Sequence, residues 1–275
     1  MLIFARVTVL GLLLPLLHAL PLQANPPRGH AAVTRLSWHL ASGALNDKGQ
    51  ALFDVLTRAD EQGLKPTDYL AGADPRGVTG EALTRVALAY IHDLKVGRKS
   101  PAKLDPALHI SPPEIDVANL LSSVYASGDV KGGLERLAPT YPEYQLLKNK
   151  LAEYRQNEAR GGWPEVPAGK TLELGVQDPA VEILRRRLEL QGYLKGSQEP
   201  SPAFDALLAD AVRNFQEHHG LDVDGKVGRR TREALNISIG DRIRQIILNM
   251  ERWRWLPDDL GRWHMRVNIA GFYLR

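Results

Sequence analysis

Residues 178–236 constrain the fold more strongly than any other part of the chain. Asp178 precedes Pro179, the order that favours a helix start, because an aspartate caps free N–H groups and proline suits the first turn. Apolar residues then recur every three or four positions, and Gly192 and Gly220 follow the first two runs. The pattern predicts three short helices around a small core, the third over residues 229–236. The three stripes comprise Val181, Leu184 and Leu188; Leu208, Ala211, Val212 and Phe215, after a capping Asp205; and Leu235.

Residues 25–160 show the same helical period. Four apolar stripes occur in this region, and none of it alternates as a strand would. Gly63 and Gly97 are expected to end the first two helices, and Pro142 to begin the fourth. We therefore expect a helical domain whose core combines these stripes. They begin at Leu52, Leu83, Val117 and Tyr144.

The segment 239–275 predicts a helix followed by one strand. Apolar and polar residues alternate over residues 263–269, the period of a strand with one buried face. A single strand leaves its edges unpaired, so this would be an orphan strand. Residues 252–255, with the sequence Arg-Trp-Arg-Trp, are expected to form an exposed aromatic and basic patch here, with packing against a following sheet in an intact protein as the alternative. The predicted fold class is mainly α, ending in an orphan β-strand.

The first 24 residues indicate export. Arg6 precedes an apolar run over residues 7–17, and Ala24 offers a small residue for cleavage. The run is shorter than the roughly 20 residues that a transmembrane helix needs. We predict a signal peptide, with an uncleaved anchor or a buried helix as the alternatives. After cleavage, the chain would be periplasmic with no transmembrane span.

The three-helix segment resembles the peptidoglycan-binding domain of bacterial cell-wall enzymes. The resemblance rests on V-x-x-L-x-x-x-L-x-x-x-G-Y, which starts at Val181, and on F-Q-x-x-H-G-L-x-x-D-G, which starts at Phe215. This spacing is specific, because few unrelated helical bundles would reproduce both motifs. The resemblance implies that peptidoglycan is the partner of this segment.

Three further motifs resemble the scaffold domain of large L,D-transpeptidases and the segment that leads into their catalytic domain. They are GLKPTDYL from Gly63, DLKVGR from Asp93 and NMERWRWLP from Asn249. The resemblance implies a division into a signal peptide at 1–24, a scaffold domain at 25–160 and a linker at 161–170. A peptidoglycan-binding-like domain would follow at 171–238. The helix and strand of 239–275 would then begin a missing catalytic domain.

The chain lacks the chemistry of that family. It contains no cysteine, so the Ser-x-Gly-Cys-x-Arg segment is absent and no thioester can form. We therefore predict no transpeptidation by these residues and assign no catalytic residue. No H-E-x-x-H motif occurs, and the glycine-rich stretch before Lys170 lacks the first glycine of a phosphate-binding loop. We expect no metal and no cofactor.

A binding role is therefore the favoured prediction. Peptidoglycan offers sugars that stack on aromatic rings and carboxylates that pair with basic groups. The alternative for the basic residues is a solvated helix face, and for Trp163 a pin that holds the linker. With 35 basic and 32 acidic residues the net charge is only +3, so we expect no nucleic-acid partner. The candidate ligand-binding residues are Trp163, Tyr193, Lys195, Arg229, Arg230 and Arg232.

The predicted function is peptidoglycan binding in the cell envelope, as the non-catalytic N-terminal part of an L,D-transpeptidase-like protein of cell-wall biogenesis. The alternative is a non-catalytic envelope protein that docks onto another cell-wall enzyme.

Overall fold

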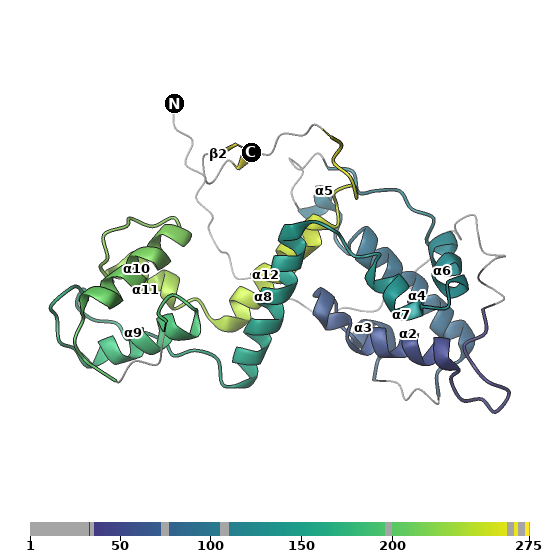
Figure 1. Ribbon diagram of the computed structural model, residues 1–275, viewed down its shortest axis with the longest axis horizontal. Coiled ribbons are helices and arrows are strands. Elements are labelled where there is room, and N and C mark those ends of the chain that lie inside the picture. Colours follow the sequence, from purple (N-terminus) through teal and green to yellow (C-terminus); the bar gives the residue numbers. More distant parts are fainter. Residues whose placement is uncertain are drawn as a thin grey trace.

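The computed structural model describes residues 33, 36–72, 77–104, 110–195, 200–262, 267–268 and 273–274. Helices dominate these residues, which confirms the mainly α fold class (Figure 1). In chain order, the elements are α2 (Asp47–Thr57), a 3₁₀ turn η1 (Ala59–Gln62), α3 (Thr67–Leu70), α4 (Gly80–Lys95), α5 (Pro101–Leu104), α6 (Val117–Ala126), α7 (Val130–Glu135), α8 (Pro142–Ala159), α9 (Pro179–Leu190), α10 (Ala206–His218), α11 (Arg229–Leu235), α12 (Ile239–Trp253), β1 (Val267–Asn268) and β2 (Tyr273–Leu274).

The first hydrophobic core lies among helices α2, α3, α4, α6, α7, α8 and α12. Each of the four predicted stripes contributes to it, with Leu52, Leu83, Leu121 and Tyr144 completely buried. The stripes share one core because each helix has only one apolar face to cover. The helical organisation expected for this region is confirmed.

The first helix ends earlier than the sequence predicts. We expected it to reach Gly63, but α2 stops at Thr57 and the chain continues as the 3₁₀ turn η1. Gly63 does end that turn, with a φ of 70° in the left-handed region. The tighter turn keeps Ala59 in the core beside the α2 stripe, which is why periodicity alone does not mark the break.

Helices α8 and α12 form an antiparallel pair at the centre of the molecule (Figure 1). Gly240 near the start of α12 lies against Glu158 near the end of α8. At the other end, the rings of Tyr141 and Trp253 are 4.9 Å apart. Helices α9, α10 and α11, which form a second core, lie between α8 and α12 in the sequence. The buried apolar residues of α12 belong to the first core and are Ile239, Ile243, Ile246 and Met250.

The predicted exposed patch at residues 252–255 is wrong for Arg254 and Trp255, whereas Arg252 is exposed and Trp253 is half-buried. Arg254 and Trp255 are each only 1% exposed. Arg254 pairs with Glu251 at 3.0 Å and donates to the Tyr144 hydroxyl at 3.0 Å. A buried guanidinium persists only with such partners, and α12 and α8 together supply them.

The second core is a bundle of α9, α10 and α11, as predicted. Asp178 caps α9 by accepting from the Ala180 N–H at 2.8 Å, and Asp205 caps α10 by accepting from Leu208 at the same distance. The stripe residues of all three helices are buried at 3% exposure or less. The three helices gather at one end of the molecule (Figure 1).

The C-terminal strand has a partner in the described residues. β1 pairs antiparallel with β2, with Val267 opposite Leu274 and Asn268 opposite Tyr273. Residues 267–268 of the predicted strand are therefore paired and do not form an orphan strand, because β2 supplies backbone partners on one edge. The rest of the alternating pattern and the segment between the two strands, residues 263–266 and 269–272, lie outside the described residues.

The predicted signal peptide at 1–24 also lies outside the described residues. Within the described ranges, no helix combines the length and the apolar character needed to cross a bilayer.

Candidate functional site

The loop between α10 and α11 is held in place by Gln216. This glutamine is only 1% exposed, although it lies in the apolar stripe of α10. Its amide nitrogen donates to Asp224 at 2.8 Å and to the Lys226 carbonyl at 2.9 Å. Its amide oxygen accepts from the Gly225 N–H at 2.9 Å. One buried side chain therefore fixes the loop against the bundle.

The turn itself forms as its residue types predict. Gly225 has a φ of 74°, which suits glycine. The Asp224 carboxylate accepts from the Lys226 N–H at 2.9 Å. This N–H bond and the bond from Gln216 lower the pKa of Asp224 against the opposing effect of burial. Asp224 is thus held ionised as a turn former.

An isolated β-bridge brings residues 171–173 beside this loop, at the start of the second unit, which is the part of the chain that forms the second core. Leu172 and Val227 exchange backbone hydrogen bonds of 3.3 and 2.8 Å, and both side chains are buried. Neighbours in an extended chain point to opposite sides, so Glu173 and Lys226 face outward. They pair there at 2.6 Å.

Beside the bridge lies an open hollow of about 520 Å³. Gln216 forms part of it, and Thr171 and Thr231 contribute hydroxyls. Its charged lining residues are three acids, Glu173, Asp222 and Asp224, and three bases, Lys226, Arg229 and Arg230. The hollow combines hydrogen-bonding groups with both signs of charge, which makes it the candidate binding site.

Two of the predicted ligand-binding residues line this hollow. Arg229 and Arg230 begin α11 and are both exposed. Arg229 pairs with Glu233 at 3.1 Å, although both side chains are largely open to solvent. A pair this exposed is weak, so Arg229 can exchange Glu233 for a ligand at small cost.

Tyr193 and Lys195 lie outside the hollow. The Tyr193 ring packs edge-on against Phe215 with centroids 5.3 Å apart and is half-buried. Burial raises the pKa of its hydroxyl. Lys195 is exposed at the end of a described segment.

Neither Arg232 nor Trp163 lines this hollow, because Arg232 binds the linker and Trp163, a linker residue, packs against its surroundings. Arg232 donates to the carbonyls of Gly169 and Lys170 at 3.3 and 2.8 Å. The Trp163 indole N–H donates to the Ile237 carbonyl at 3.3 Å, and its ring meets Tyr154 edge-on at 5.2 Å. These contacts favour the pinning alternative for Trp163.

Arg187 joins the two cores at the same place. It is 1% exposed and lies over the Trp163 ring at 4.4 Å. It donates to the carbonyls of Pro164, Leu235 and Ile237. Burial, with repulsion from Arg242, lowers the pKa of Arg187 to about 9. Among the described residues no carboxylate pairs with this guanidinium. Its buried positive charge is instead stabilised by three backbone carbonyls and the Trp163 ring.

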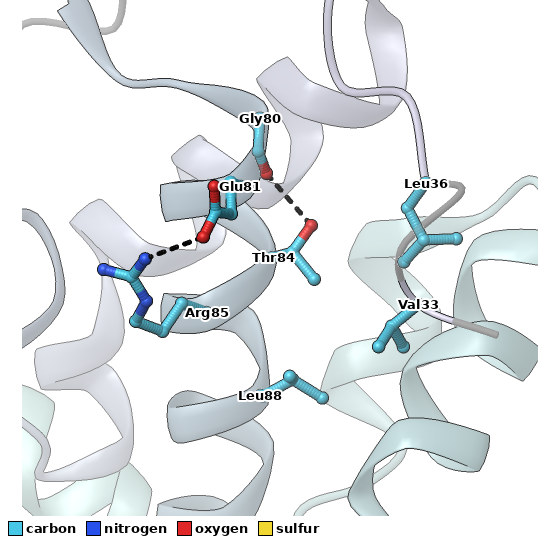
Figure 2. A pocket seen from close by; sticks show the side chains of 7 residues that line it. All are labelled: Val33, Leu36, Gly80, Glu81, Thr84, Arg85 and Leu88. Atoms are coloured by element: carbon cyan, nitrogen blue, oxygen red, sulfur yellow. Dashed lines mark hydrogen bonds and ion pairs between the residues drawn. The ribbon is translucent and has the colours of Figure 1, made fainter. Parts of the chain in front are cut away.

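A second hollow, of about 450 Å³, lies beside α4 (Figure 2). Val33, Leu36 and Leu88 supply apolar walls. Its polar side chains are few: Glu81, which pairs with Arg85 at 3.2 Å, and Thr84, which donates to the Gly80 carbonyl at 3.0 Å, so this hollow offers a ligand fewer polar groups than the one beside α11. We therefore favour the hollow beside α11 as the functional site.

The described residues contain no group of three or more His, Asp or Glu side chains placed to hold a metal ion.

The prediction missed several residues of the hollow. Gln216 had a signal, because a polar residue inside an apolar helical stripe indicates a buried hydrogen-bonding role. Asp222 and Lys226 lie close to Asp224 and Gly225, the end of the motif that starts at Phe215, and could be suspected from it. Thr171 and Glu173 gave no signal, because only the pairing of Leu172 with Val227 brings them to the loop.

Two family models match the chain. Residues 33–151 match a model described as "Scaffold domain", and residues 177–235 match one described as "Putative peptidoglycan binding domain". Both of these parts of the resemblance are thereby supported. The L,D-transpeptidase part stays a prediction.

Two curated proteins share shorter similarities. Over 118 residues the chain is 31% identical to "N-acetylmuramoyl-L-alanine amidase CwlM" of Mycobacterium tuberculosis, covering 40% of this chain and 29% of that protein. Over 68 residues it is 35% identical to "Probable CtpA-like serine protease" of Staphylococcus saprophyticus, covering 25% of this chain and 13% of that protein. The chain therefore spans less than a third of the length of either relative.

Proposed function

We propose that the α9–α11 unit binds peptidoglycan through the hollow beside α11. The observation that carries the proposal is this built hollow, lined by Arg229 and Arg230 and formed mostly by the segment that matches a peptidoglycan-binding model. Stem peptides of peptidoglycan carry carboxylates, and guanidinium groups bind carboxylates with two parallel hydrogen bonds. We place the ligand here and not at Tyr193, Lys195, Arg232 or Trp163.

We further propose that this chain is the wall-binding and scaffold part of an L,D-transpeptidase-like protein of cell-wall biogenesis. The match of residues 33–151 to a scaffold domain and the motifs at Gly63 and Asn249 support this. The division at 1–24, 25–160, 161–170, 171–238 and 239–275 is part of the proposal, as is export to the periplasm. These residues contain no cysteine and hence no thiolate for acyl transfer.

Co-sedimentation with purified sacculi tests the binding role. The purified chain should pellet with sacculi, and the double variant Arg229→Ala/Arg230→Ala should bind about tenfold more weakly, as expected when charged hydrogen bonds are lost. Arg186→Ala is the matched control, because Arg186 is an exposed arginine of the same unit outside the hollow. Wild-type protein that stays in the supernatant would defeat the proposal. Unchanged binding by the double variant would remove the hollow as the site.

A further inference from the structure

The hollow beside α11 has a balanced charge. Its three carboxylates are matched by three cationic side chains. A site for a purely anionic ligand would carry an excess of cations, which draws the ligand in and neutralises it. Equal numbers of both signs fit a ligand that itself carries both.

Most of these charges already have partners within the protein. Lys226 pairs with Glu173 at 2.6 Å, and Arg229 pairs with Glu233. Asp224 is bound by Gln216 and by the Lys226 N–H. These contacts use four of the six charged groups of the lining.

Asp222 and Arg230 are the two that remain. Both are exposed, and within the described ranges neither side chain has a hydrogen bond or an ion pair. No ion pair joins them to each other, although they line the same hollow. One free carboxylate and one free guanidinium thus face a shared space.

We propose that this hollow recognises a zwitterionic amino-acid group, in which Arg230 binds the carboxylate and Asp222 binds the ammonium. The proposal rests on the peptidoglycan-binding role given above. A diamino acid of a stem peptide carries such a pair while its second amine is unlinked. Cross-linking converts that amine to a neutral amide, which removes the partner of Asp222. The hollow therefore prefers peptides that are not yet cross-linked at this amine.

The two groups stand on elements that are fixed before a ligand arrives. Arg230 is in α11, whose Thr231 hydroxyl accepts from Gln216 at 3.1 Å. Asp222 begins the turn that Gln216 and Gly225 hold against α10. Because the backbone on both sides is anchored by one buried glutamine, binding needs little ordering of the chain.

The test compares the full chain on untreated sacculi and on sacculi whose free amines have been acetylated. Wild-type protein should bind acetylated sacculi about fivefold to tenfold more weakly, the value expected of one charged hydrogen bond at an open site. Asp222→Asn should show the same loss on untreated sacculi and no further loss on acetylated ones. Asp210→Asn removes an exposed carboxylate of α10 outside the hollow and should behave as wild type.

The outcomes distinguish the zwitterion proposal from the peptidoglycan-binding role on which it rests. Equal binding of both kinds of sacculi by wild-type protein overturns the zwitterion proposal and leaves the peptidoglycan-binding role in place. Additive losses from acetylation and from Asp222→Asn overturn it as well, because the amine would then act elsewhere. Failure to bind any sacculi defeats both proposals.

Discussion

Gln216 is a polar side chain at a position where the helical stripe calls for an apolar one. It bonds to Asp224, Gly225, Lys226 and Thr231. An apolar substitute would leave the buried Gly225 N–H without an acceptor. Gln216 therefore contributes less hydrophobic burial than an apolar residue would, but its hydrogen bonds fix the loop.

Gln216→Leu should lower the free energy of unfolding of the second unit by about 2–4 kcal/mol, the range for a broken buried network. Chemical denaturation followed by circular dichroism measures it. Asn214→Leu is the matched control, because Asn214 is an exposed amide on the same helix, and should stay within about 0.5 kcal/mol of wild type. Equal effects of the two substitutions would contradict the role given to Gln216.

Asp205 links the stability of α10 to pH. Burial raises the pKa of its carboxyl, but the Leu208 N–H and the Arg185 guanidinium, 2.6 Å away, lower it more, so the net shift is downward. A carboxyl whose pKa falls on folding stabilises the fold above its unfolded pKa of about 3.9, and this contribution disappears as the pH drops through the folded pKa.

Asp205→Asn keeps a capping oxygen and removes the charge, so it should cost about 1 kcal/mol at pH 7 and less at pH 2.5. The figure is small because half of the Asp205 side chain is exposed and water screens the pair. Urea titrations at the two pH values give the difference. A cost that stays the same at both would show that the charge contributes nothing.

The α8–α12 pair makes the second unit an insertion into the first. The chain leaves the first core at the end of α8 and returns at the start of α12, where Gly162 lies against Ile239. Trp163 and Ile237 are joined there by a hydrogen bond. Because the two ends of the insertion meet, the first core does not need it for closure.

Replacing residues 164–236 by a four-residue Gly/Ser linker should therefore leave the first unit folded. Far-UV circular dichroism should retain the helical signal of the remaining residues, and thermal unfolding should stay cooperative. A broad transition with exposed apolar surface, seen as dye binding, would mean that the first core depends on the second.

The helices and several of their starts could be predicted from the sequence because the signals are local, although the end of α2 could not. Asp178 and Asp205 cap helices within three residues of themselves, and each stripe is visible within one helix. The partner of each stripe could not be predicted. The residues of α12 show one apolar face, but nothing in them specifies α8 as its cover.

The site was only partly predictable for the same reason. Arg229 and Arg230 were identified because α11 is a local feature with a familiar motif. The hollow beside them depends on the pairing of Leu172 with Val227, which no local pattern indicates. The burial of Arg254 was not predicted, because a basic residue between tryptophans suggests an exposed surface. In the structure its charge is paired with Glu251 and hydrogen-bonded to Tyr144 inside the core.

Arg187 couples the two cores of the molecule. Its carbon stem belongs to α9, while its head group reaches Pro164, Ile237 and the face of Trp163, which packs against the first core. We expect the wild-type chain to unfold in one thermal transition for this reason.

Arg187→Met keeps the apolar stem and removes these contacts, so the two units should unfold separately. A lost coupling of about 1 kcal/mol moves the transition of the smaller unit by about 4–8 °C. Differential scanning calorimetry would show the second peak, and Arg186→Ala, on the exposed side of α9, should retain one. A single peak for Arg187→Met would place the coupling elsewhere.

The antiparallel pairing of α8 with α12 also determines how the molecule would respond to mechanical tension. Both covalent attachments of the inserted unit leave from the same end of this pair. A force that pulls on that unit is shared by two chain segments, the one after α8 and the one before α12. It therefore acts along the axes of both helices in the same direction. The pair is then sheared against the rest of the first core, so that many side-chain contacts resist together instead of opening one after another.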